Sequence, residues 1–257
     1  GYSFLMENYK PIKRTMFKLI EAICAKRNCI TISCSLGEHQ ETLKLTKHAT
    51  YVNNGINMEE LQEIIDRTEK VEHSFTVYTL GRICYQKNPT LFNEIAELLP
   101  KVKFVWIGDG ELRKELTSKN IEITGWVDRA TAIKYAVNAD VFLLSSRWEG
   151  LPISLLESMY MKKVCVVSNV IGNRDVIHNN ENGFVCTEIN DFVRSIKKIE
   201  KNEGTIFSDK AYEDIIYNYN TKIMYQKYKL IYDRAILKNK EKNRRRNIKF
   251  TKNDSSN

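Results

Sequence analysis

Short runs of β-branched and aromatic residues alternate with helical patterns from residue 75 to residue 186, and few folds are compatible with this alternation. The runs are FTVYTL (75–80), KFVWIG (103–108), IEITG (121–125), VFLLSS (141–146), VCVVS (164–168) and GFVC (183–186). Helices are expected between them at 89–99, 111–118, 129–138, 152–162 and 173–178. Parallel strands need long crossover connections, which helices supply. The sequence therefore predicts an α/β fold with one complete, doubly wound (Rossmann-like) parallel sheet.

The first 56 residues show a shorter version of the same pattern. A helix, a strand, a helix and a strand are expected in that order, at 11–27, 29–34, 37–46 and 49–53. Asn53-Asn54-Gly55 then marks a turn. This order is typical of the last βαβ unit of an α/β domain. Because the sequence begins at Gly1 without Met, we expect this second domain to be truncated, with its beginning upstream.

After residue 187 the pattern is helical, with helices expected at 189–202, 208–217 and 221–239. A basic tail follows at 240–257, and its composition predicts disorder. The chain has a formal net charge of +8, and from Lys238 onward eight Lys or Arg stand against two acidic residues, a surplus of +6. The positive charge therefore belongs mainly to the tail, and the folded part shows no sign of a nucleic-acid partner.

Three interpretations of the tail remain open: contact with a membrane surface, contact with nucleic acid, and a solubilising end. Phe250 is the only aromatic residue after Lys238, which argues against base stacking. An anionic membrane attracts basic residues by roughly 1 kcal/mol each. Among binding roles, peripheral membrane contact is therefore the expected one.

The cysteines and histidines show no clustering in the sequence. The six cysteines form no CxxC pair, and the four histidines are scattered along the sequence. Unpaired cysteines fit a reducing, cytoplasmic location. No apolar run approaches the ~20 residues that a membrane span needs.

Polar residues and glycines follow the first two strands of the expected sheet, where ligands of α/β proteins bind. The loop GRICYQKN (81–88) carries Arg82 and Lys87 after Gly81. These two cations could neutralise a diphosphate, and the alternative is a solvated basic loop. Gly108 and Asp109 follow the next strand, where a glycine pair permits close approach of a ligand but also suits an ordinary tight turn.

Two carboxylates flank a turn in the segment RWEGLPISLLE, residues 147–157. Pro152 suits the first position of a helix, and the free amides of that helix would form an anion site. Glu149 precedes the turn, and Glu157 would lie in the second turn of the helix. Each carboxylate could accept a pair of vicinal hydroxyls, such as those of a sugar and a ribose. Taken alone, the segment fits equally well a structural interpretation, in which one glutamate lies on the surface and the other stabilises the helix.

Taken in order, these segments resemble a known family. The matching motifs are GRxxxxKN from residue 81, IGDGELRxxL from residue 107, TGWV at 124–127 and ADVFLLSSRWEGLPISLLESM at 139–159. NVIGNRDVI and ENGF follow in the family's order. The chain is thereby similar to the glycosyl transferases group 1, retaining glycosyltransferases of the GT-B fold. The segment EGLPISLLE matches the family's pair of glutamates separated by seven residues.

The resemblance implies a role for each candidate residue. Arg82 and Lys87 would bind the donor's diphosphate and stabilise the leaving nucleotide, and Glu149 would hold hydroxyls of the donor sugar. Glu157 would hold the ribose. The other donor-binding residues implied are Gly81, Gly108, Asp109, Gly125, Trp126, Val127, Gly150 and Leu151. The donor would be a UDP-sugar or GDP-sugar, with no metal and no further cofactor.

The implied reaction is retaining transfer of a hexose from a nucleotide sugar to a hydroxyl of a glycan or lipid-linked acceptor. Surface polysaccharide synthesis of the capsule or lipopolysaccharide type, at the inner face of the membrane, is the expected setting. The implied domains are acceptor-side residues 1–56, donor-binding residues 57–203, helices 204–239 that pack back toward the first domain, and the tail 240–257. The alternatives are a nucleotide-sugar epimerase or hydrolase, a donor-binding fragment without transfer activity, and a basic membrane-binding or nucleic-acid-binding module.

Two positions depart from the family pattern. Gly172-Asn173-Arg174-Asp175 stands where the family has Gly-Gly and then a glutamate, and this leaves the sugar preference open. Asn173 is expected to cap the helix at 173–178. Lys162 and Lys163 replace a glycine and a small residue, which we expect to be a surface change of little consequence.

Overall fold

A parallel six-stranded sheet forms the centre of the molecule, as predicted. The computed structural model describes residues 2–6, 9–25, 29–204 and 206–254, with side chains as far as residue 241. The strands are β3 (Thr76–Leu80), β4 (Lys103–Ile107), β5 (Ile121–Ile123), β6 (Val141–Leu144), β7 (Val164–Ser168) and β8 (Phe184–Cys186). Their order is β5-β4-β3-β6-β7-β8, and every neighbouring pair is parallel. The α/β fold class is thereby confirmed.

Each face of this sheet has its own apolar core. Neighbouring residues of a strand point to opposite faces, so Val77 and Tyr78 enter different cores. Phe92 and Trp106 pack against one another on the Val77 face, with ring centroids 4.9 Å apart. All four side chains are at most 1% exposed. Burial on both faces explains why the strands read as continuous apolar runs.

Helices cross over between the strands, but two expected helices are absent. The helices present are α4 (Pro89–Glu97), α5 (Arg129–Val137), α6 (Ile153–Tyr160) and α7 (Ile189–Glu200). The segment predicted as a helix at 111–118 holds only the short 3-10 helix η3 (Arg113–Glu115). Its continuation is interrupted because the Asn93 side chain accepts hydrogen bonds from the amides of Thr117 and Ser118, at 2.7 and 2.8 Å.

The helix predicted at 173–178 is a series of turns instead. The Asn182 side chain accepts from the His178 amide at 2.7 Å and donates to the Val176 carbonyl at 2.9 Å. These bonds replace those of a regular helix, so Asn173 is not a helix cap. Pro152 also differs slightly from expectation, because it is the N-cap residue of α6 and not its first helical residue.

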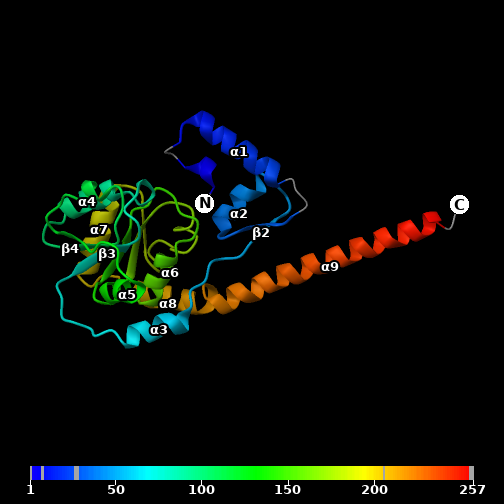
Figure 1. Cartoon of the computed structure of the whole chain (residues 1–257). Coiled ribbons are helices and arrows are strands. Elements are labelled where there is room, and N and C mark those ends of the chain that lie inside the picture. Colours follow the sequence, from blue (N-terminus) through cyan, green and yellow to red (C-terminus); the bar gives the residue numbers. More distant parts are fainter. Residues whose placement is uncertain (1, 7–8, 26–28, 205, 255–257) are drawn as a thin grey trace.

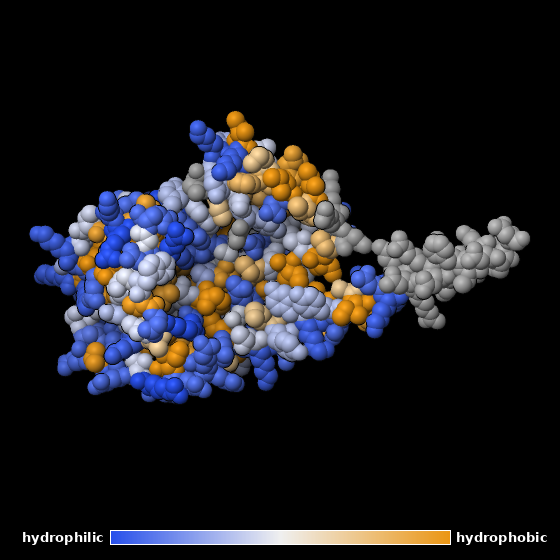
Figure 2. Space-filling model, in the orientation of Figure 1, coloured by the Kyte–Doolittle hydropathy of each residue, from blue (hydrophilic) through white to orange (hydrophobic). Residues whose placement is uncertain are grey.

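A smaller unit, residues 2–56, lies beside the large sheet (Figure 1). It contains η1 (Ser3–Leu5), α1 (Pro11–Ala25), β1 (Thr31–Ser33), α2 (Leu36–Leu43) and β2 (Ala49–Tyr51). Strands β1 and β2 are parallel and α2 crosses between them, so the expected βαβ unit is present. Apolar side chains of α1 remain on its surface (Figure 2).

Three helices connect the two units. Helix α3 (Met58–Asp66) leads from β2 to the large sheet, and α8 (Ile206–Asn218) and α9 (Thr221–Asp254) close the described chain. The Ile56 amide donates to Tyr219, and the Thr221 amide donates to Ile56, both at 3.0 Å. The chain therefore returns after α8 to the point at which it entered the large unit, and α9 extends past the small unit (Figure 1).

The basic tail differs from the expected disorder. Helix α9 continues to Asp254, and residues 255–257 lie outside the described part of the chain. Lys, Arg and Glu have high helix propensity, which favours continuation of the helix once α9 has begun. Within the described residues, no helix is both long and apolar enough for a membrane span.

Candidate active site

The loops after β3 and β6 meet at the edge of the sheet where the strand order reverses. From β3 the chain proceeds outward to β4 and β5, and from β6 it proceeds the other way to β7 and β8. Ligands of open α/β sheets bind at such a switch point, because neighbouring loops leave in opposite directions there. The loop of residues 81–88 and the loop of residues 145–152 both start at this point.

Hydrogen bonds join these two loops directly. The Ser145 hydroxyl donates to the Lys87 carbonyl at 2.9 Å. The Arg147 amide donates to the Gln86 carbonyl at 2.8 Å, and the Gln86 side chain donates to the Trp148 carbonyl at 3.0 Å. The loops are therefore fixed relative to one another before any ligand binds.

The Arg147 side chain reinforces this junction. Its guanidinium lies over the Tyr85 ring, 4.5 Å from the ring centre, and donates to the Asn88 side chain at 2.8 Å. Asn88 ends the short helix η2 (Tyr85–Lys87) in a left-handed conformation, with φ of 53°. Arg147 thus holds the turn that carries Lys87.

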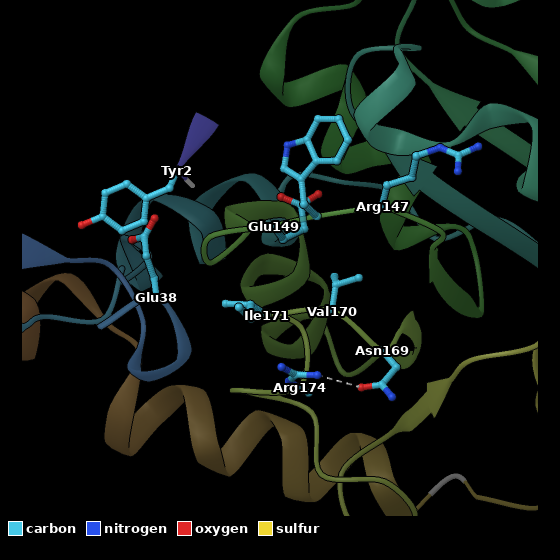
Figure 3. A pocket seen from close by; sticks show the side chains of 9 residues that line it. Tyr2, Glu38, Arg147, Glu149, Asn169, Val170, Ile171 and Arg174 are labelled. Atoms are coloured by element: carbon cyan, nitrogen blue, oxygen red, sulfur yellow. Dashed lines mark hydrogen bonds between the residues drawn. The ribbon is translucent and has the colours of Figure 1, made fainter. Parts of the chain in front are cut away.

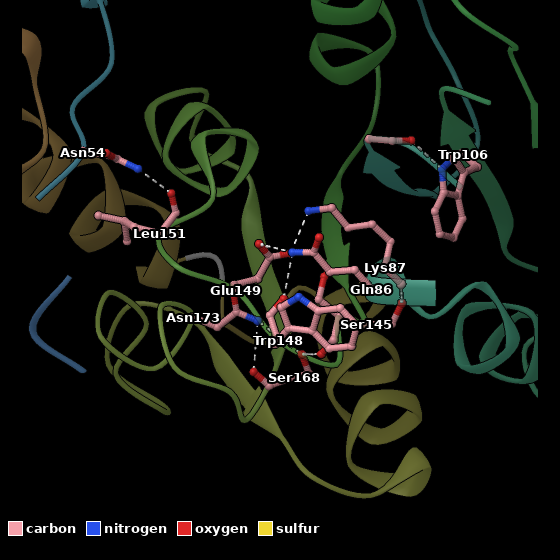
Figure 4. Close-up of polar contacts among 12 residues, drawn as sticks. Asn54, Gln86, Lys87, Trp106, Ser145, Trp148, Glu149, Leu151, Ser168 and Asn173 are labelled. Carbon is pink, nitrogen blue, oxygen red and sulfur yellow. Dashed lines mark hydrogen bonds and ion pairs between the residues drawn. The ribbon is translucent and has the colours of Figure 1, made fainter. Parts of the chain in front are cut away.

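The carboxylate of Glu149 is held at both oxygens within this junction (Figure 4). Lys87 Nζ lies 2.7 Å from Oε1, and Gln86 Nε2 lies 3.2 Å from Oε2. The Glu149 side chain is 6% exposed and that of Lys87 is 17% exposed. A buried carboxylate is stable only with such partners, so the sequence-predicted residues Lys87 and Glu149 form one charge-compensated pair.

The turn that follows Glu149 packs tightly against the loop after β7. Gly172 has φ of 86°, and a Cβ atom there would lie 2.3 Å from the Gly150 carbonyl oxygen. The Asn173 side chain is fully buried and donates to the Ser168 carbonyl at 3.1 Å. Within the described residues, the amides of Gly150 and Leu151 have no hydrogen-bond partner. These two predicted donor-binding amides are therefore available to a ligand.

The glycines after β3, β4 and β5 also converge. Gly108 and Gly125 form an isolated β-bridge, and a Cβ atom on Gly108 would lie 2.3 Å from the Gly81 carbonyl oxygen. Asp109 lies beside them, with its carboxylate 2.8 Å from both the Gly110 amide and the Arg113 guanidinium. The structure thus brings together Gly81, Gly108, Asp109 and Gly125, as the sequence suggested.

Arg82 is separate from the Lys87–Glu149 pair. Its exposed guanidinium pairs with Glu111, with Nη2 3.1 Å from Oε2. Among the described residues, no hydrogen bond or ion pair joins Arg82 to Lys87 or Glu149. Arg82 therefore lies on the rim of the junction.

Glu157 lies in α6 and pairs with Arg129 at the start of α5. Its side chain is 5% exposed, and its Oε1 lies 2.7 Å from Arg129 Nη1. Arg129 also contacts Glu60 of α3 at 3.0 Å. Partial burial lowers the pKa of Arg129, but the Glu157 carboxylate outweighs this effect and raises it overall. The pair places Glu157 close to the segment 125–127, in which Trp126 is 71% exposed and Val127 packs against the core.

A pocket of about 260 Å³ lies between the two units, on the side of Glu149 that faces residues 2–56 (Figure 3). Its lining residues come from both units and are Tyr2, Glu38, Arg147, Trp148, Glu149, Asn169, Val170, Ile171 and Arg174. Glu38 accepts hydrogen bonds from the Cys34 amide and thiol, at 3.0 and 3.1 Å. Burial raises the pKa of Glu38, whereas the hydrogen bonds from Cys34 lower it. The net result is a pKa below the usual value, so the carboxylate is ionised. Within the described residues, no cluster of His, Cys, Asp or Glu suits a metal ion.

Sequence reasoning missed several residues of this region. Gln86 directly precedes Lys87, but only the structure shows its bond to Glu149. Arg147 and Arg174 stood inside matched motifs, yet nothing in their spacing pointed to a shared pocket. Tyr2 and Glu38 lie more than 100 residues away in sequence from Glu149 and could be placed only by the packing of the two units.

Known proteins resemble this chain in sequence and in fold. The model of the family described as glycosyl transferases group 1 matches residues 61–221. The chain belongs to this family. The match includes the junction residues Gln86, Lys87 and Glu149 and also the Glu157–Arg129 pair.

Two curated bacterial relatives are glycosyltransferases. One is an Escherichia coli UDP-Gal:alpha-D-GlcNAc-diphosphoundecaprenol alpha-1,3-galactosyltransferase, 29% identical over 90% of this chain and 67% of its own length. The other is the Staphylococcus aureus poly(ribitol-phosphate) alpha-N-acetylglucosaminyltransferase, 29% identical over 63% of this chain and 35% of its own length. The chain thus spans between about a third and two thirds of these relatives.

Solved structures share the fold. Anabaena HepE in complex with UDP and glucose has a TM-score of 0.72 and 14% identity, covering 90% of this chain and 70% of its own. S. aureus TarM has a TM-score of 0.70 and 22% identity, covering 86% and 47%. The fold is therefore of the GT-B type.

Proposed function

We propose that the chain provides the donor-binding half and part of the acceptor side of a glycosyltransferase. The enzyme would transfer a hexose from a nucleotide sugar, UDP-sugar or GDP-sugar, to a hydroxyl of a glycan or lipid-linked acceptor, with retention. The setting would be surface polysaccharide synthesis at the cytoplasmic face of the membrane. The observation that carries the proposal is the Lys87–Glu149 pair at the switch point of the sheet, beside the amides of Gly150 and Leu151, which have no partner among the described residues.

The chemistry needs a cation where charge develops. As the glycosidic bond breaks, negative charge builds on the β-phosphate of the leaving nucleotide, and a fixed cation stabilises that state. Lys87 would supply this charge, and Arg82 would add a second one by leaving Glu111, an exposed partner of small energetic weight. Glu149 would accept hydroxyl hydrogens of the sugar, while the amides of Gly150 and Leu151 would donate to its oxygens or to the phosphate.

The nucleoside would extend along the other loops. Glu157, held by Arg129, would accept the ribose hydroxyls, and the backbone of 125–127 would contact the base. Gly81, Gly108 and Asp109 would line the path between the base and the phosphates. Residues 57–203 would then be the donor-binding domain, residues 1–56 the acceptor side, and residues 204–239 the helices that brace the two.

Nucleotide-sugar binding is the first test. Thermal-shift measurements with a panel of UDP-sugars and GDP-sugars should raise the melting temperature, since a ligand at 100 times its dissociation constant adds about 2.7 kcal/mol of stability. Lys87→Met and Glu157→Ala should lose most of this shift, while Arg194→Gln, in an exposed i,i+3 pair with Asp191, should keep it. An unchanged shift in Glu157→Ala would contradict the ribose assignment.

Product analysis separates transfer from the alternatives. A chain with transfer activity gives a glycosylated acceptor whose anomeric configuration matches that of the donor. Release of free sugar would indicate a hydrolase, and an epimerised nucleotide sugar without acceptor product would indicate an epimerase. Donor binding without any product would leave a binding fragment.

The basic end of α9 would bring the enzyme to an anionic membrane, where a lipid-linked acceptor is held. Co-sedimentation with anionic vesicles should therefore fall when residues 238–257 are removed. Equal binding of the full chain and the chain without residues 238–257 would contradict the proposed membrane contact.

A further inference from the structure

Arg174 carries a charge that no carboxylate neutralises within the described part of the chain. It lines the pocket between the two units, and its only side-chain hydrogen bond in the described structure is a 3.5 Å contact from Nη1 to the Asn169 side-chain oxygen (Figure 3). None of the ion pairs between described residues includes it. Arg174 is an exposed residue at the pocket, so its remaining donors are available to a ligand there.

The neighbouring carboxylates are already engaged elsewhere. Glu149 is held by Lys87 and Gln86, at 2.7 and 3.2 Å. Glu38 accepts from the amide and thiol of Cys34. Asp175, the next residue in the chain, accepts from the Gly37 amide at 2.9 Å. Each of these carboxylates has other partners, and within the described residues none of them pairs with Arg174.

The turn that carries Arg174 is fixed on both sides. Gly172 packs against the Gly150 carbonyl, and the buried Asn173 side chain is bonded to Ser168. The Arg174 amide donates to the Val170 carbonyl at 3.1 Å. Its guanidinium is therefore presented from a rigid base, which limits the entropy lost when it binds a partner.

The pocket lies on the acceptor side of Glu149. Lys87 and Gln86 hold this carboxylate from the loop after β3, whereas Tyr2 and Glu38 of the small unit line the pocket opposite. In Figure 3 the Arg147 side chain points away from Tyr2 and Glu38, which leaves Arg174 as the labelled cation that does not turn away from the small unit. A group in this pocket would touch both units, as an acceptor must.

We propose that this pocket binds a phosphate group of the acceptor, with Arg174 as its main ligand and Asn169 as a second donor. Guanidinium is the side-chain group best suited to phosphate, because it offers two parallel N–H donors. The Asn169 side-chain nitrogen would exchange its exposed 3.3 Å bond to the Thr187 hydroxyl for one to the phosphate. This inference rests on the proposed function, and it makes the substrate an acceptor with a sugar phosphate or polyol phosphate, not a neutral glycan.

The test is calorimetric titration of the full chain with α-glucose 1-phosphate, with free glucose as the neutral control. Saturating UDP or GDP, whichever raises the melting temperature, keeps the donor's phosphate site filled. Arg174→Gln should weaken binding of the sugar phosphate by roughly tenfold or more, and Arg174→Lys by less, because a lysine keeps the charge but not the fork. Arg194→Gln, an exposed arginine outside the pocket, should bind as the parent chain does.

Each outcome decides the assignment. Equal affinity of the parent chain and Arg174→Gln, or equal affinity for glucose and its phosphate, would overturn it. Competition between the sugar phosphate and the nucleotide would also overturn it, because the phosphate would then occupy the donor site. If Arg174→Gln weakens only the binding of a donor whose sugar carries a carboxylate, such as UDP-glucuronate, Arg174 would be assigned to the donor sugar instead. If no nucleoside diphosphate binds at all, the proposed function fails, and the same titration of the free chain still decides whether Arg174 binds phosphate.

Discussion

The large sheet and the small unit of residues 2–56 bury their apolar residues to very different extents. Val77, Phe92 and Trp106 of the large unit are at most 1% exposed. In α1 of the small unit, Ile12 and Leu19 are 85% and 61% exposed, although this helix is clearly amphipathic. The large unit therefore buries the apolar residues of its strands and helices, whereas the small unit has an apolar surface without a partner in the described structure. We therefore expect apolar side chains of the large unit to contribute more to the free energy of unfolding than those of α1.

Core truncation should show this difference most strongly. Phe92→Ala removes a fully buried ring that contacts Phe104 and Trp106, and it should lower the free energy of unfolding by about 3–5 kcal/mol. Leu19→Ala, on the exposed face of α1, should change it by less than about 0.5 kcal/mol. Urea unfolding followed by tryptophan fluorescence measures both. Similar losses would mean that the α1 face is buried in solution and that the contrast is wrong.

A buried lysine gives the second largest effect, and it lies in the large unit. Lys163 donates to the carbonyls of Val137 and Ala139, at 2.9 and 2.6 Å, and burial lowers its pKa from 10.5 to about 8. The unfolded chain thus binds more protons between pH 8 and pH 10.5. Lys163 should therefore contribute roughly 3 kcal/mol of added stability over this window, because the penalty of burying its charge is removed.

The neighbouring Lys162 provides the control for this pH effect. It is exposed and pairs with Asp209, which raises its pKa. Relative to the parent chain, Lys163→Met should lack this contribution, so its stability should change less favourably with pH above pH 8, whereas Lys162→Met should follow the parent. Thermal unfolding at half-unit steps of pH reports the slope for each chain. Identical slopes in the parent chain and Lys163→Met would show that Lys163 does not titrate in this window. Lys163 is thus not the inconsequential surface change that the sequence suggested.

The fold was predictable wherever the residues of a strand or helix determine that element by themselves. Six strands, their parallel arrangement and the loops that carry Lys87 and Glu149 follow from apolar runs and from the motifs after them. The missing helices at 111–118 and 173–178 depend on Asn93 and Asn182, which bond to backbone groups 24 and 4 residues away, and residue type does not reveal such bonds. Gln86 and Arg174 were missed for the same reason, since their roles arise from contacts between loops.

Gln86 tests whether the junction in the large unit is held as tightly as its core. Gln86→Met keeps the side-chain length but removes the donor to Glu149 Oε2 and to the Trp148 carbonyl. We expect a loss of about 1–2 kcal/mol in stability, because two acceptors lose their partner. If Glu149 binds the donor sugar, kcat should fall more than KM rises, since the carboxylate loses its orientation while the phosphate contacts remain. Gln226→Met, at an exposed glutamine of α9, should change neither value.

The contact between the two units should show the smallest effect. Asp175 accepts from the Gly37 amide in the first turn of α2, where a negative charge is favourable. Asp175→Asn has nearly the same shape but lacks the charge, so it should weaken the attachment of the small unit by about 0.5–1 kcal/mol. Hydrogen exchange should then quicken in α2, β1 and β2 and stay unchanged in β3, β6 and β7. Exchange that quickens equally in both units would show that the two units unfold together. The large and small units would then form one cooperative unit, and their different burial would not produce a difference in stability.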